Sequence, residues 1–163
     1  MGKQGEKKPW DGEPDYERFS HAGLECIVIR MGQKRYLCGY VVIPEDHPLH
    51  GVDYTETEHD DDLPTIDVHG GVTYSGGVIA DGAEYGDESL GFCWGFDCAH
   101  AGDYSEGVNI ARYILGDVHG DMPFGQCGEN RYGVYRDFEF VRTECRKMAD
   151  QIAGVTAKTG GAS

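Results

Sequence analysis

The chain has 163 residues and a formal net charge of −15, from 29 acidic and 14 basic residues. Its length is most simply that of one domain, and no apolar run approaches the roughly 20 residues that span a membrane. The charge is regional, because residues 36–111 carry 16 carboxylates, five of the seven histidines and no Lys or Arg. Such a region must face water, bind a cation or meet a basic partner, and without a basic stripe it disfavours direct binding of nucleic acid.

The predicted elements begin after a polar start. We expect an N-terminal arm over residues 1–20 without a signal peptide, one domain over 21–154 and a flexible tail over 155–163. Runs rich in apolar and β-branched residues predict strands at 24–31 and 35–43. A short turn joins these two strands, so we predict a β-hairpin at the start of the domain.

The later elements complete an α+β pattern. Residues 45–64 lack an apolar period and predict a solvated acidic loop, and two more strands are predicted at 66–75 and 90–98. A helix should begin after Asp137 as N-cap and stop at Gly154. We therefore predict an α+β fold, with a mostly antiparallel β-sheet, long loops and a C-terminal amphipathic helix packed on one face. The apolar face of that helix consists of Phe138, Val141, Cys145, Met148 and Ile152.

The cysteines predict a reducing compartment. No two of the six are spaced as CxxC, and several lie within apolar segments. We interpret them as small buried residues with reduced thiols, which is the usual state of cysteines in a cytosol, with a structural zinc site and disulfides as the alternatives.

One motif resembles a metal-binding loop without its usual context. Residues 116–121 read GDVHGD, and GDxHG presents an Asp and a His to the metals of many two-metal phosphoesterases. Those enzymes need further ligands downstream, whereas the 42 residues after Asp121 contain no His. We interpret the motif as a Gly/Asp turn with a surface histidine.

The candidate site comes from two other segments, DVHGGVTY at 67–74 and GFDCAHAGD at 95–103. In a strand, Asp67 and His69 would share a face, the following glycines would leave space for a ligand, and the second segment leaves the end of an apolar strand. Two alternatives for the polar groups are a metal set and a His–Asp general base; a third is hydrogen bonds that only close turns. The predicted ligand-binding residues are His69, Gly70, Gly71, Thr73, Tyr74, Asp97, His100 and Asp103.

These motifs carry a family resemblance. HGGVTYSG at 69–76 and WGFDCAHAGD at 94–103 resemble a family of small phage-encoded accessory proteins of unassigned function. An LCGYV strand at 37–41, a PxxHPxxG segment at 44–51 and a C-terminal helix over 135–152 extend the resemblance. It implies a phage accessory protein in the cytosol of a bacterial host, and it implies no activity.

Three function classes remain open. We favour a binding protein that acts on a host small molecule or host protein, related to host defence, because no nucleophile–base–orienter set can be named. The alternatives are a metal-dependent hydrolase that uses the Asp/His cluster, and an acidic decoy for a basic nucleic-acid-binding host protein. No cofactor is predicted, with a divalent metal as the alternative, and we predict no direct nucleic-acid partner and no membrane partner. Enzymatic activity and oligomeric state stay open.

Overall fold

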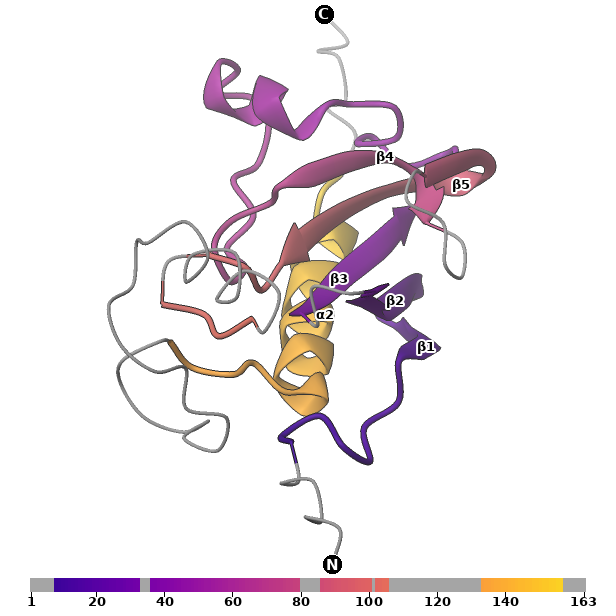
Figure 1. The fold of residues 1–163 in the computed structure, drawn as a ribbon. Coiled ribbons are helices and arrows are strands. Elements are labelled where there is room, and N and C mark those ends of the chain that lie inside the picture. Colours follow the sequence, from indigo (N-terminus) through magenta and orange to yellow (C-terminus); the bar gives the residue numbers. More distant parts are fainter. Residues whose placement is uncertain (1–7, 33–35, 80–85, 101, 106–132, 157–163) are drawn as a thin grey trace, which may run out of the picture.

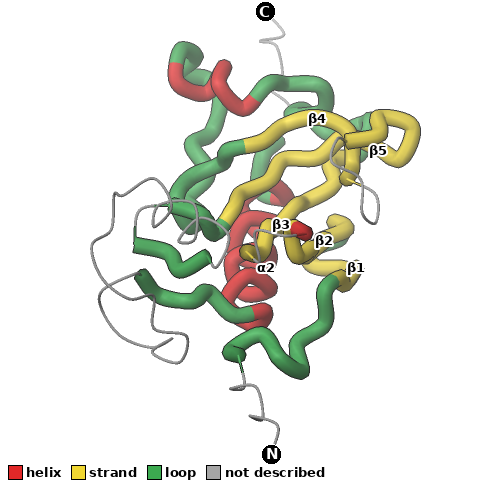
Figure 2. Tube along the Cα trace, viewed as in Figure 1, coloured by secondary structure: helices red, strands yellow, loops and turns green. Residues whose placement is uncertain are grey.

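In the described residues, the fold is a five-stranded antiparallel sheet with one long helix packed against one face, which confirms the predicted α+β class (Figures 1 and 2). The strand order is β1-β2-β3-β5-β4, and every neighbouring pair is antiparallel. The elements are β1 (Tyr16–His21), β2 (Leu24–Met31), β3 (Tyr36–Ile43), η2 (Tyr54–Glu58), β4 (Tyr74–Ile79), β5 (Gly86–Asp97) and α2 (Phe138–Ala153). The computed structural model describes residues 8–32, 36–79, 86–100, 102–105 and 133–156.

Strands β2 and β3 form the predicted hairpin inside the sheet and carry buried residues on both faces. In β2 the side chains of Cys26 and Val28 belong to the apolar cluster beneath the helix, and those of Ile27 and Ile29 belong to the cluster on the opposite face. This split follows the period-2 geometry of a strand. Because both faces are apolar, the pairing register of β2 is held from two sides.

The helix packs closely on the sheet because one strand position carries no side chain. A Cβ at Gly39 of β3 would collide with the sulfur of Cys145 in α2 and with the ring of Phe96 in β5. The five residues of the predicted apolar stripe are all buried, and Asp137 caps the helix by accepting a hydrogen bond from the backbone N of Phe140 at 2.7 Å. The sequence thus predicted both the N-cap and the buried face of α2 correctly.

Two predicted boundaries were wrong. Residues 66–73 form no strand, and β4 starts only at Tyr74 and pairs with β5. Part of the expected arm is also strand, because β1 pairs with β2 at the sheet edge and places Phe19 against the core under α2. Within the described residues, no helix is long and apolar enough to cross a membrane.

The irregular connection from 44 to 73 brings a loop to the end of β5. The connection contacts β4, where the backbone N of Tyr54 donates a hydrogen bond to Ser75 Oγ. It then runs beside the end of β5 (Figure 1). There the backbone N of Thr73 donates to the carbonyl of Gly95 at 2.9 Å. The fold therefore sets residues 67–73 beside the segment that leaves β5.

Candidate functional site

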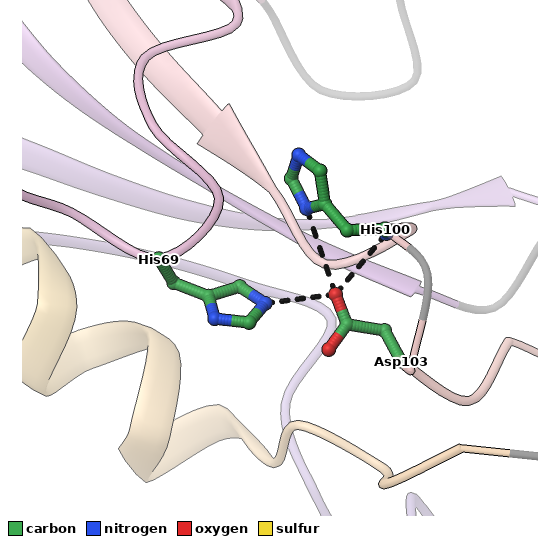
Figure 3. A group of neighbouring side chains, drawn as sticks. All are labelled: His69, His100 and Asp103. Carbon is green, nitrogen blue, oxygen red and sulfur yellow. Dashed lines mark hydrogen bonds and ion pairs between the residues drawn. The ribbon is translucent and has the colours of Figure 1, made fainter.

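Asp103 is the centre of a polar cluster just beyond the end of β5 (Figure 3). Its side chain is only 1% exposed. One carboxylate oxygen, Oδ2, lies 2.8 Å from Nε2 of His69 and accepts from the backbone N of His100 at 3.1 Å. The other, Oδ1, accepts from Nε of Arg136 at 2.9 Å. The buried carboxylate thus joins three segments that are far apart in the sequence.

These partners keep Asp103 ionised. Burial raises the pKa of this carboxyl, but the hydrogen bonds from His69 and Arg136 outweigh burial, so the pKa lies below its ordinary value. A short parallel bridge between Asp103 and Val134 aligns the chain that carries Arg136, with Tyr104 N donating to Val134 O at 2.8 Å. This backbone pairing therefore places the guanidinium of Arg136 beside the carboxylate of Asp103.

His100 packs on a glycine and has an unpaired ring nitrogen. A Cβ at Gly70, where φ is +67°, would collide with the His100 ring, so the turn must be glycine for two reasons. Nδ1 of His100 is buried and has no hydrogen-bond partner among the residues that the structure describes. It lies 3.6 Å from Asp103 Oδ2 and 3.7 Å from Asp97 Oδ1, which is too long for a hydrogen bond. A buried polar atom without a partner costs about 1–3 kcal/mol, which calls for an explanation.

His69 is positioned by the helix. Its backbone N donates to Oε2 of Glu144 in α2 at 2.7 Å, and its ring lies edge-on to Phe140 with 5.2 Å between centroids. About two turns further along α2, the side chain of Gln151 bonds both the backbone N and the carbonyl of Asp67 at 2.8 Å. Side chains of α2 thus satisfy the backbone groups of Asp67 and His69, which a neighbouring strand would have bonded if this segment were a strand.

The two histidines converge as predicted, although by a different route. Their ring centroids are 5.6 Å apart and nearly perpendicular. The predicted shared strand face of Asp67 and His69 was wrong, since this segment is a turn closed by the Gly71 N to Val68 O hydrogen bond. Loop geometry, rather than strand geometry, brings the rings together.

Asp97 and Thr73 close the two loops onto each other. Thr73 Oγ1 donates to Asp97 Oδ2 at 2.9 Å, and Oδ1 of the same carboxylate accepts from the backbone N of Ala99 at 3.0 Å. This is the turn-closing role that the sequence left open. Asp97 remains the nearest further carboxylate to the His100 ring.

Tyr74 lies apart from the cluster. Its ring packs edge-on against Tyr40 in the apolar cluster opposite the helix, and its hydroxyl donates to the carbonyl of Gly77 at 2.8 Å. Gly71 has φ +81°, and no atom of the described residues lies within 4 Å of the position that a Cβ would take, so it serves the turn and not a close contact. A cavity of about 500 Å³ lies elsewhere, between residues 61–66 and the end of α2, and none of the predicted site residues lines it.

Three contributors were missed by the sequence analysis, namely Arg136, Phe140 and Glu144. The charge pattern held a signal for the first, because an acidic region without Lys or Arg needs a cation from outside it. Arg136 supplies that cation to Asp103, as Lys147 of α2 does to Asp67 at 3.2 Å. No pattern marked the other two, since both lie on α2 outside its predicted apolar stripe.

The cluster has the donor atoms and spacing of a metal site. One ligand atom each from His69, His100 and Asp103 lies within 4.8 Å of the other two. Ligand atoms bound tetrahedrally at about 2.1 Å from a metal ion are roughly 3.4 Å apart. The separations of 2.8 Å and 3.6 Å from Asp103 Oδ2 to the two imidazoles lie on either side of that value. Side-chain shifts of about 1 Å would suffice for coordination.

Comparison of the chain with protein-family models, curated proteins and solved structures found no match. The GDVHGD motif at 116–121 and Cys127 lie outside the described residues. The site therefore has to be interpreted from its own geometry.

Proposed function

We propose that this protein binds a first-row transition-metal ion of the zinc or iron(II) class through His69 Nε2, His100 Nδ1 and Asp103 Oδ2. The unpaired, buried Nδ1 of His100 is the observation that carries the proposal. It faces two carboxylate oxygens at 3.6–3.7 Å, a distance that suits a shared cation between them better than a direct bond. A bound ion would give this nitrogen a partner.

The surrounding groups support a metal ligand role for Asp103. Arg136 holds Oδ1 at 2.9 Å and so fixes the carboxylate with Oδ2 toward the imidazoles. Partners of this kind orient metal ligands and tune their basicity. The acidic stretch from 36 to 111 also attracts cations, since its formal charge is −16.

The donor set indicates the class of ion. Two imidazoles and one carboxylate are the ligands of many zinc centres and of non-haem iron(II) sites, and both leave coordination positions for water or a substrate. Exchange of a bound water would place a ligand directly on the ion. In this proposal the predicted ligand binds at a metal ion. A bound divalent metal, which the sequence analysis gave as the alternative, takes the place of the expectation of no cofactor.

Metal-dependent hydrolysis is a second candidate, favoured by one observation. The carboxylate of Asp97 lies 3.7 Å from His100 Nδ1 and is 30% exposed, so it could accept a proton from a water bound to the ion. Covalent catalysis by the neighbouring Cys98 is disfavoured, because burial raises the pKa of its thiol. The phage origin and the host partners rest on the motif resemblance alone and stay predictions, as does the acidic decoy.

The test is a titration of chelator-treated protein with Zn²⁺ and, without oxygen, with Fe²⁺ or Co²⁺. We expect about one equivalent to bind, and a visible spectrum of bound Co²⁺ that reports nitrogen and oxygen ligands. His100→Ala should weaken binding by about 100-fold or more, while its melting temperature without metal stays close to that of the wild type, because the removed nitrogen had no partner.

His21→Ala is the matched control. His21 also pairs with an aspartate, Asp150 at 2.9 Å, but this pair is exposed, with side chains 33% and 64% accessible. The control variant should bind the metal as the wild type does. A wild-type protein that takes up no ion, or equal binding by the His100→Ala variant, would contradict the proposal.

A further inference from the structure

We infer that the metal centre, with Arg136 beside it, binds a small molecule through a carboxylate group. This inference rests on the proposed metal site and names the ligand class that it would take. One carboxylate oxygen would coordinate the ion, and the other would accept hydrogen bonds from the guanidinium of Arg136.

Two contacts place that guanidinium next to the proposed metal position. It shares the carboxylate of Asp103 with His69, and it stacks over the ring of Phe140 at 4.8 Å from the centroid. The His69 ring contacts the same Phe140 ring at 5.2 Å. Arg136 and His69 thus flank one aromatic ring and bond to one carboxylate, which sets the guanidinium and the metal ligand side by side.

The guanidinium still has donors to offer. Nε of Arg136 bonds to Asp103, whereas Nη1 and Nη2 bond to no residue of the described part of the chain. The side chain is 29% exposed, so a ligand can reach it. The arginines of α2 itself are engaged: Arg142 bonds to Glu17 and Glu139, and Arg146 pairs with Glu139. The planar guanidinium of Arg136, with its free N–H groups, has the geometry to donate two hydrogen bonds to one carboxylate.

Formal charge favours a carboxylate over a dianionic phosphate. Asp97 and Asp103 contribute two negative charges, Arg136 contributes one positive charge, and a divalent ion adds two, with neutral imidazoles. The centre then carries one net positive charge, which a single carboxylate neutralises. A dianion would leave an excess of negative charge in a region that already lacks Lys and Arg.

The experiment uses the full chain loaded with Co²⁺ and follows its visible spectrum during titration with benzoate. Benzamide serves as the uncharged analogue and inorganic phosphate as the dianionic one. We expect benzoate to shift the spectrum at lower concentration than either, and metal-free protein to bind none of them. Arg136→Gln should weaken benzoate binding by about tenfold or more, since two charge-assisted hydrogen bonds are lost.

Arg146→Gln is the control, because it removes the same charge at a place on α2 where the arginine is paired with Glu139. It should bind benzoate as the wild type does. Arg136→Lys keeps the charge but loses the fork, so we expect intermediate affinity. Metal content is measured for each variant, which separates the two proposals: a protein that takes up no metal refutes the site itself. Equal benzoate binding by loaded wild-type and Arg136→Gln protein, or tighter binding of phosphate, refutes the carboxylate inference alone.

Discussion

Two regions of this protein are built around a buried charged residue with partners from distant segments, and they differ in how completely those partners satisfy it. Arg30 of β2 has a side chain that is 3% exposed, and it donates to Asp15, Glu13 and the hydroxyl of Tyr135, each at 2.8 Å. Every nitrogen of its guanidinium has a partner. The Asp103 cluster is as buried at its centre, yet in the described part of the chain Nδ1 of His100 has no hydrogen-bond partner.

The difference separates a structural network from a candidate site. Glu13 also accepts from the backbone N of Phe138, so the Arg30 network ties the N-terminal segment to the start of α2. Burial lowers the pKa of Arg30, but bonds to Tyr135 and Glu13 outweigh it and hold the pKa above its ordinary value. A fully paired network mainly stabilises a fold, whereas an unpaired buried nitrogen beside carboxylates indicates a ligand.

The largest effect is expected for the structural network of Arg30. Arg30→Met should lower the free energy of unfolding by about 4 kcal/mol, because Glu13, whose side chain is only 18% exposed, would lose its cation. Denaturant unfolding measures the loss, and Arg18→Met is the control, since the exposed pair of Arg18 and Glu25 should be worth at most about 1 kcal/mol. Metal affinity of the folded Arg30→Met protein should not change. An equal loss in both variants would mean that burial does not set the strength of these pairs.

A smaller effect is expected at Asp103. In metal-free protein, Asp103→Asn should cost about 2 kcal/mol, since the amide keeps the shape but loses the charge that His69 and Arg136 bond. The folded pKa of Asp103 lies below its ordinary value of 3.8, so this stabilisation is complete above that value and is lost as the pH falls through the folded pKa. Unfolding measured from pH 7 to pH 2 should therefore show the two proteins converge in acid. A difference that stays constant over this range would contradict the ionic role.

The smallest expected effect is that of metal on the reactivity of the thiols. It tests whether any cysteine is a metal ligand. Burial raises the pKa of Cys26 to about 11 and those of Cys38 and Cys93 to about 12, so few thiolates form at neutral pH. The five described cysteines should stay unreactive in the native protein, with or without metal. After unfolding without reductant, a thiol reagent should count all six cysteines of the chain. A count of four or fewer would show disulfides, and protection by metal alone would indicate thiolate ligands.

The sequence predicted the parts of the fold in which local pattern and burial agree. The strand at Leu24–Met31 was placed with the correct ends, and the helix from Phe138 was placed with its cap and stripe. The prediction failed at 66–73, where apolar and β-branched residues suggested a strand. Gly70 and Gly71 both have positive φ there, and helix side chains satisfy the backbone instead of a neighbouring strand.

The candidate site was predicted in the same uneven way. His69, His100 and Asp103 were selected because they lie in Gly-rich or strand-end segments, where a rigid scaffold can hold polar groups around a pocket. Arg136 lies 33 positions from Asp103, and their contact depends on the backbone bridge at Val134. Tyr74 was included because of its neighbours in the chain, but strand alternation sends its ring to the opposite face. A single sequence does not show which residues far apart in the chain come into contact in the fold.

The most direct measurement is anomalous diffraction from crystals of the protein loaded with Zn²⁺. The account predicts one peak at about 2.0–2.2 Å from His69 Nε2, His100 Nδ1 and Asp103 Oδ2, with Arg136 still bonded to Asp103 Oδ1. A peak at another group of residues would contradict it. So would a loaded crystal in which His69 and Asp103 keep their 2.8 Å hydrogen bond with no ion between the two histidines.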